Sequence, residues 1–130
     1  MSKKYLTGNA RNKQSDDDPN FYPTCYAALP PLMVAEGKRF PKTIWEPACG
    51  NGALVVPLRN RGYNVVATDL HNWGCPDSQT GIDFLSDVST SVAAQMAVDY
   101  GSFGILTNPP FNKAEEFVDR ATTLSPYVAM

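Results

Sequence analysis

Residues 43–69 read TIWEPACGNGALVVPLRNRGYNVVATD, and their pattern predicts a strand, a turn, a helix and a second strand. The run TIWE (43–46) is short and apolar, ends in an acid and is followed by a turn that contains glycine, which predicts a short buried strand. Residues 53–62 have helical spacing and stop at Gly62. NVVATD (64–69) is β-branched and apolar, which is typical of a strand buried on both faces. This order predicts a β-α-β unit with two parallel strands.

The same alternation continues beyond residue 69. Short strands are expected over 82–85, 103–107 and 127–130, and helices over 88–100 and 112–124. Together the elements predict an α/β fold, with a mostly parallel sheet that carries helices on both faces. In such sheets ligands bind beyond the carboxyl ends of the strands, where the strand order reverses.

The helix expected over 112–124 has the clearest pattern. Its apolar stripe consists of Ala114, Phe117, Val118 and Ala121. Asn112 and Glu115 are spaced like the two members of a capping box, which predicts that the helix begins at Asn112.

The whole chain has 130 residues, enough for one domain with a core and too few for two. We assign residues 21–130 to that domain and residues 1–20 to a flexible polar tail. Four basic residues gather in the tail: Lys3, Lys4, Arg11 and Lys13. A phosphate-contacting arm is the alternative to a solvated tail. The net charge of −2 gives no global basic field that would indicate nucleic acid.

The three cysteines, at positions 25, 49 and 75, show no CxxC spacing, and the chain has one His. A zinc site is therefore not expected, and a reducing compartment fits best. The N-terminus lacks the apolar region of a secretion signal, and no run approaches the roughly 20 apolar residues of a membrane span. We therefore expect a cytoplasmic protein.

EPACGNG (46–52) follows the first strand and is rich in small residues. Ala48, Gly50 and Gly52 let the backbone approach a ligand closely and adopt positive φ. The turn matches neither GxGxxG nor GK[ST], so a phosphate-binding loop is poorly supported. Asp69 stands nineteen residues after Gly50, at the end of the next strand, where an acid can accept two ribose hydroxyls. The alternative is a glycine-rich turn beside a solvated acid.

TNPPFNK (107–113) lies between an expected strand and an expected helix. Its two prolines remove two backbone donors and fix two φ angles, and Pro109 pushes Asn108 away from helical geometry. The stretch is therefore a stiff platform that aims one amide and the ring of Phe111. The alternative is an ordinary strand-to-helix turn, in which Asn and Pro are common.

WEPACGNGAL (45–54) resembles motif I of the class I S-adenosylmethionine-dependent methyltransferases. TNPPF (107–111) resembles motif IV of the amino-methyltransferases, especially the adenine-N6 DNA methyltransferases. Asp69 matches the ribose-binding acid of motif II, and GIDFL (81–85) resembles the segment that faces the adenine. FYPT (21–24) is similar to motif X, which touches the methionine end of the cofactor. The resemblance spans roughly residues 21–130 and implies a Rossmann-like methyltransferase fold.

The resemblance assigns roles to two groups of residues. Binding of S-adenosyl-L-methionine is implied for Tyr22, Pro23, Thr24, Glu46, Pro47, Ala48, Cys49, Gly50, Asn51, Gly52, Asp69, Leu70, Asp83, Phe84 and Asn108. The implied catalytic turn consists of Asn108, Pro109, Pro110 and Phe111. Glu46 could instead be a mere strand-end acid, Trp73 could cover the adenine or simply pack, and His71 reads as a bystander. No metal is expected.

The implied activity is methyl transfer to an exocyclic amine, with adenine N6 in DNA as the expected acceptor, as in enzymes of phages and mobile elements. DNA is therefore the expected partner. The same turn also serves methyltransferases that modify protein glutamine or RNA, and Phe111 is compatible with each. A third alternative is a domain that binds the cofactor or a partner chain without turnover.

Family members continue for several more strands, so the resemblance implies a sheet that is incomplete at its C-terminal edge. If 127–130 is a strand beside 103–107, its outer edge has no further partner, which invites pairing with other chains. We expect a homodimer through this edge, with the two strands antiparallel, or poor order of this end.

Overall fold

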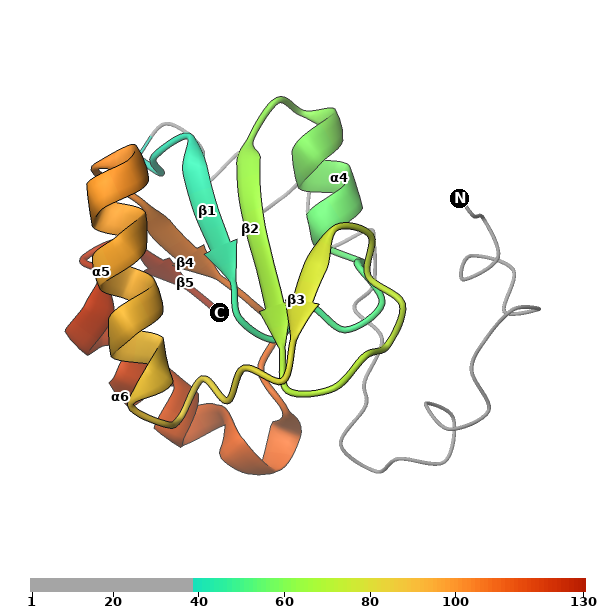
Figure 1. The fold of residues 1–130 in the computed structure, drawn as a ribbon, viewed down its shortest axis with the longest axis vertical. Helices are drawn as coiled ribbons and strands as arrows, with labels where there is room; N and C mark the ends of the chain where they lie inside the picture. Colours follow the sequence, from blue (N-terminus) through green and yellow to red (C-terminus); the bar gives the residue numbers. More distant parts are fainter. Residues whose placement is uncertain (1–38) are drawn as a thin grey trace.

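The computed structural model describes residues 39–130, which form a five-stranded, all-parallel sheet of order β3-β2-β1-β4-β5 with three helices (Figure 1). The strands are β1 (Thr43–Glu46), β2 (Asn64–Asp69), β3 (Ser78–Thr80), β4 (Gly104–Leu106) and β5 (Val128–Ala129). The helices are α4 (Val55–Asn60), α5 (Val88–Tyr100) and α6 (Ala114–Leu124), and a 3-10 turn, η2 (Phe111–Lys113), precedes α6. The expected tail and the motif X residues Tyr22, Pro23 and Thr24 lie outside the described residues.

β1 lies at the centre of the sheet. Glu46 of β1 is opposite Ala67 of β2, and Trp45 is opposite Ile105 of β4. β3 pairs with the last three residues of β2, which ends at Asp69. Because all the strands run the same way, the turns that follow β1, β2 and β4 meet at one edge, the lower edge in Figure 1.

Helices cover both faces of the sheet, as the sequence predicts. On one face Ile44 belongs to a buried cluster with Val55 and Leu58 of α4. The next residue, Trp45, belongs to a second cluster with Met96 of α5 and Phe117 of α6. Successive strand residues point to opposite faces, so α4 lies on one side of the sheet in Figure 1 and α5 and α6 on the other.

The strand predicted over 82–85 does not form, and this prediction is wrong. These residues make a turn, in which the Ser86 N–H donates to the Asp83 carbonyl and the Leu85 N–H to Asp83 Oδ1, both at 3.0 Å. Phe84 is buried, but in the helix-covered cluster rather than in a strand ladder. The edge strand is β3, whose sequence SQT is polar and mostly exposed, so it carries no apolar signal.

The predicted capping box at the start of helix 112–124 is also wrong. α6 begins at Ala114, and its N-cap is Lys113, which makes no side-chain capping hydrogen bond. Asn112 lies inside η2, where the Lys113 N–H donates to the Pro110 carbonyl at 3.0 Å. The 3-10 turn thus occupies the residues that the capping box would need. Within the predicted stripe the buried residues are Phe117 and Ala121, and Val118 is exposed.

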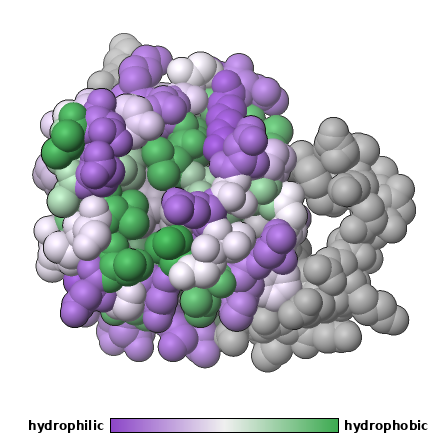
Figure 2. Space-filling model, viewed as in Figure 1, coloured by the Kyte–Doolittle hydropathy of each residue, from purple (hydrophilic) through white to green (hydrophobic). Residues whose placement is uncertain are grey.

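The remaining predicted elements form within two residues of their expected bounds. Across residues 39–130, none of the helices has the length and apolar character needed to span a bilayer. On the face shown in Figure 2, apolar side chains occur in small groups between polar ones.

Candidate functional site

The turn after β1 is built on two glycines. Gly50 and Gly52 have φ of 56° and 93°, and the Gly52 N–H donates to the Cys49 carbonyl at 2.9 Å. A Cβ on Gly52 would lie 3.1 Å from Pro76 Cδ and 3.4 Å from Cys75 Sγ. Position 52 therefore requires glycine both for its backbone conformation and for the close approach of the neighbouring loop.

Two strand-end acids brace the turns that follow their strands. Asp69 Oδ2 accepts the Gly50 N–H at 2.9 Å, and Asp69 Oδ1 accepts the His71 N–H at 2.9 Å. Glu46 Oε1 accepts the Ala48 N–H at 2.9 Å. A carboxylate offers about four acceptor positions, so Asp69 can also accept a hydrogen bond from a ligand.

Burial sets the ionisation of both acids. It raises the pKa of Glu46 from 4.5 to about 8, with a smaller contribution from Asp69, against the lowering effects of the Thr107 hydroxyl and the Ala48 amide. The Thr107 hydroxyl lies beside the carboxyl without well-formed hydrogen-bond geometry, and it is the buried side-chain oxygen that lacks a partner within residues 39–130. Burial also raises the pKa of Asp69, against the lowering effects of the His71, Gly50 and Leu70 amides.

Cys49 lies in the same turn and faces Cys75. A hydrogen bond with Cys75, followed by burial, raises the pKa of the Cys49 thiol. Both cysteines are buried and free. Because the thiolate is the nucleophilic form, the raised pKa does not favour a reactive thiol at Cys49.

A cavity of about 300 Å³ opens between the turns that follow β1, β2 and β4. The site residues predicted from the sequence that line it are Pro47, Ala48, Cys49, Gly50, Asn51, Asp69, Leu70, Asp83, Phe84, Asn108, Pro109 and Pro110. Glu46 and Gly52 are buried and do not line the cavity, and Phe111 lies outside it. The fold therefore brings two distant segments, the small-residue turn and the Asn-Pro-Pro turn, to one cavity.

The structure adds lining residues to this set: Ala53, His71, Trp73, Ile82, Leu85, Asn112, Lys113 and Phe117. The rings of His71 and Trp73 are in edge-to-face contact at 5.7 Å. Most of these residues are close in sequence to the turns that the sequence analysis identifies. This proximity is the signal from which they could have been predicted. Phe117 has no such signal, because its position in the apolar stripe of α6 explains it without a ligand.

One wall of the cavity is aromatic and continuous with the core. The ring of Phe84 lies 5.2 Å from that of Trp45 and 5.0 Å from that of Phe117. Phe84 is 2% exposed, so it presents little of its surface to the cavity. These contacts hold the turn at 82–87 against α6.

A second, open hollow of about 380 Å³ adjoins the first and shares Asn108 and Pro109 with it. Its remaining lining is apolar: Phe111, Ala114, Val118 and Met130. Phe111 is 78% exposed. The Asn-Pro turn therefore lies between the first cavity and an apolar surface hollow.

Comparison of this chain with protein-family models, curated proteins and solved structures finds no match. Within the described part of the chain, no three His, Cys, Asp or Glu side chains gather as a metal site would require. The functional assignment therefore depends on the geometry of the cavity and on the resemblance of its two turns.

Proposed function

We propose that this chain is an S-adenosylmethionine-dependent methyltransferase of Rossmann-like fold that acts on an exocyclic amine, with adenine N6 in DNA as the acceptor. The observation that carries the proposal is the convergence of Asp69, Asp83 and Asn108 on one cavity. Asp69 ends β2, Asp83 follows β3 and Asn108 follows β4. Each therefore offers an acceptor oxygen at the carboxyl edge of the parallel sheet.

The residues present fit this cofactor. The cavity volume lies at the lower end of the roughly 300–1,000 Å³ of ligand pockets. Gly50 leaves the turn open to close approach, and the carboxylate of Asp69, which lines the cavity, suits the hydroxyls of a ribose. Asp83 and Phe84 supply an acceptor and an aromatic edge for an adenine.

The chemistry that the cofactor supplies is a methyl carbon bonded to a sulfonium, so that the C–S electron pair returns to sulfur as the amine nitrogen forms the new C–N bond. The chain contributes orientation. The Asn108 side-chain oxygen and the Pro109 carbonyl accept the two amine hydrogens, which directs the nitrogen lone pair toward the cavity. Water takes up the released proton. The two prolines keep these acceptors fixed.

The acceptor approaches from the second hollow. Asn108 and Pro109 line both hollows, so an amine held there faces the cofactor cavity. The exposed ring of Phe111 offers a stacking surface beside it, a contact worth about 1–3 kcal/mol in single-stranded nucleic-acid sites. A target in duplex DNA would first have to be flipped out of the helix.

The proposal is tested by calorimetry with S-adenosylmethionine and by methyl transfer to unmethylated DNA. We expect binding and transfer to adenine. If the methyl group is transferred only to RNA or to a glutamine-bearing peptide, the proposed acceptor is wrong and the proposed chemistry stands. Binding without transfer to any of the three would indicate a cofactor-binding domain, and no binding at millimolar cofactor would overturn the proposal.

A further inference from the structure

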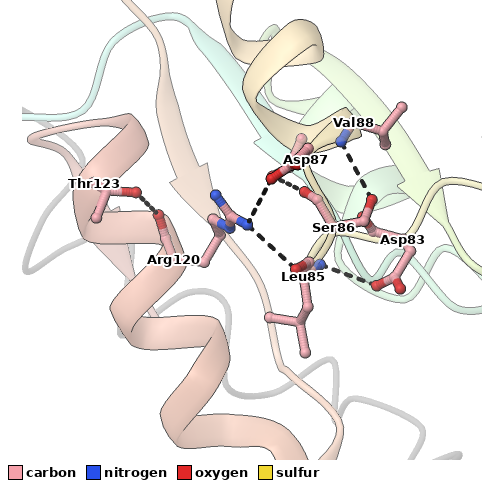
Figure 3. Close-up of polar contacts among 8 residues, drawn as sticks. Asp83, Leu85, Ser86, Asp87, Val88, Arg120 and Thr123 are labelled. Atoms are coloured by element: carbon pink, nitrogen blue, oxygen red, sulfur yellow. Dashed lines mark hydrogen bonds and ion pairs between the residues drawn. The ribbon is translucent and has the colours of Figure 1, made fainter.

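Arg120 of α6 ties that helix to the turn that forms one wall of the cavity (Figure 3). Its Nη2 donates to the Leu85 carbonyl at 3.2 Å and lies 4.0 Å from the Asp87 carboxylate. The Asp87 side chain is fully exposed, so the ion pair contributes little. The contact that fixes the geometry is the one with Leu85.

Leu85 transmits this constraint to Asp83. The Leu85 N–H donates to Asp83 Oδ1 at 3.0 Å, while the Ser86 N–H and Oγ donate to the Asp83 carbonyl at 3.0 and 2.8 Å (Figure 3). Asp83 itself lines the cavity. With Oδ1 engaged by Leu85, the orientation of the carboxylate is set and Oδ2 remains to accept from a ligand.

The other end of this turn is attached to the sheet. The Gly81 N–H donates to the Leu70 carbonyl and the Ile82 N–H to the Asp69 carbonyl, both at 3.2 Å. Arg120 supplies the attachment on the side of α6, next to the ring contact between Phe84 and Phe117. The turn is thus held between β2 and the helix that follows the Asn-Pro turn.

We propose that Arg120 is a positioning residue for the adenine of the cofactor, acting through Leu85 to hold Asp83 in the orientation that accepts the exocyclic amine. This inference rests on the proposed function. An oriented carboxylate favours adenine, which has an amine to donate, over hypoxanthine, which has a carbonyl at that place. Loss of the orientation should therefore reduce the preference for adenine, and not merely the stability of the fold.

The test compares the binding of S-adenosylhomocysteine with that of its deaminated analogue, S-inosylhomocysteine, by calorimetry. Arg120→Met keeps an apolar stem and removes the guanidinium. We expect Arg120→Met to weaken the binding of S-adenosylhomocysteine about tenfold and the binding of S-inosylhomocysteine less than about twofold. Asp87→Asn, which removes the ion pair and leaves the Leu85 contact, is the matched control and should leave both affinities within about twofold. Thermal unfolding of each variant checks the fold.

Two further variants separate positioning from general stability. In an Asp83→Ala background, Arg120→Met should change the ratio of the two affinities no further, since the group that it positions is gone. Arg120→Lys keeps the charge but loses the guanidinium fork, so its ratio of the two affinities should lie between those of the wild type and Arg120→Met. If Arg120→Met does not fold, Arg120→Lys provides the test. A wild-type ratio in every folded Arg120 variant would overturn the inference. A wild type that binds neither ligand would instead overturn the proposed function.

Discussion

Asp69 uses one carboxylate both to hold two turns and to face the cavity. Asp69→Ala should weaken the binding of S-adenosylmethionine by about 1–3 kcal/mol. The substitution removes the carboxylate that accepts from the turns and, in the complex, from the ribose hydroxyls. Calorimetry would measure the loss, with Asp99→Ala on the exposed side of α5 as control. Wild-type affinity in Asp69→Ala would exclude this acid from the cofactor site.

Asn108 is expected to act on the acceptor and not on the cofactor. Asn108→Ala should leave cofactor affinity within a few fold and abolish methyl transfer, since only the acceptor amine loses a partner. Asn112→Ala is the matched control, because Asn112 also lines the cavity and carries the same amide. An equal loss of binding and transfer in Asn108→Ala would mean that the turn is structural.

Glu46 makes stability depend on pH. Between its ordinary pKa of 4.5 and its raised pKa of about 8, the folded chain holds a proton that the unfolded chain has released. The free energy of unfolding therefore falls as the pH rises through this window, by at most about 1.4 kcal/mol per pH unit. Glu46→Gln, which is neutral at every pH, should flatten this part of the profile.

Denaturant unfolding at intervals from pH 5 to pH 8 would measure the effect of Glu46, with the exposed Glu116→Gln as control. Burial also raises the pKa of Asp69, which therefore acts on the free energy of unfolding in the same direction. Parallel profiles for the wild type and Glu46→Gln would show that Glu46 is ionised in the folded chain.

Helices and strands with a regular pattern of buried apolar residues can be predicted from the sequence. Elements that depend on strand pairing or on local hydrogen bonds cannot. β1, β2 and α5 have the predicted bounds, because apolar runs and spacing determine them. β3 is polar and exposed, so only its pairing with β2 makes it a strand. The turn at 82–87 has strand-like apolar residues, but Asp83 and Ser86 close it by local hydrogen bonds, which outcompete a ladder.

The candidate site follows the same rule. The turns at 46–52 and 107–111 could be placed at one edge of the sheet, because both follow buried strands. That Phe111 lies outside the first cavity could not be predicted, since Phe111 begins η2 and lines the surface hollow instead. Arg120 was not foreseen either, because its partner is a main-chain carbonyl, which any residue could supply.

The turn after β1 gives a prediction that separates backbone strain from crowding. Gly52 and Gly62 have nearly the same φ, 93° and 91°, but a Cβ would crowd Pro76 at 52 and meet nothing within 4 Å at 62. Each Gly→Ala should cost about 1 kcal/mol or more of unfolding free energy through its φ. Gly52→Ala should cost about 1–3 kcal/mol beyond Gly62→Ala, and it alone should weaken cofactor binding.

Denaturant unfolding and calorimetry of the Gly52→Ala and Gly62→Ala variants would measure both quantities. Equal destabilisation in the two variants would show that the 46–52 turn accommodates a methyl group by moving away from the loop at 75–76.

For the whole molecule, the outer edge of β5 carries a prediction of association. The N–H groups of Ile105 and Thr107 donate to the carbonyls of Tyr127 and Ala129, so the N–H and C=O of Val128 point away from β4. No other strand among residues 39–130 pairs with that edge. We propose that two copies join there, with their strands antiparallel.

Sedimentation at several concentrations would reveal this association of the β5 edges. Val128→Pro removes the outward N–H without touching the bonds to β4, so it should shift the chain to monomer. Val128→Thr keeps the N–H and is the control. A wild type that remains monomeric with an ordered β5 would exclude association through this edge.

The central position of β1 has a consequence for the order in which the chain folds. β2 follows β1 closely in the sequence. The other neighbour of β1 is β4, which pairs with it through Gly104 and Ile105, far along the chain. During synthesis one side of β1 therefore stays open until β4 emerges, which slows folding and leaves an apolar edge exposed to aggregation. Asn108 follows β4 and Phe117 lies in α6, so the cavity cannot form before these segments are made. A ligand of this cavity then stabilises only chains in which β1, β2 and β4 have assembled, and its binding serves as a measure of that step of folding.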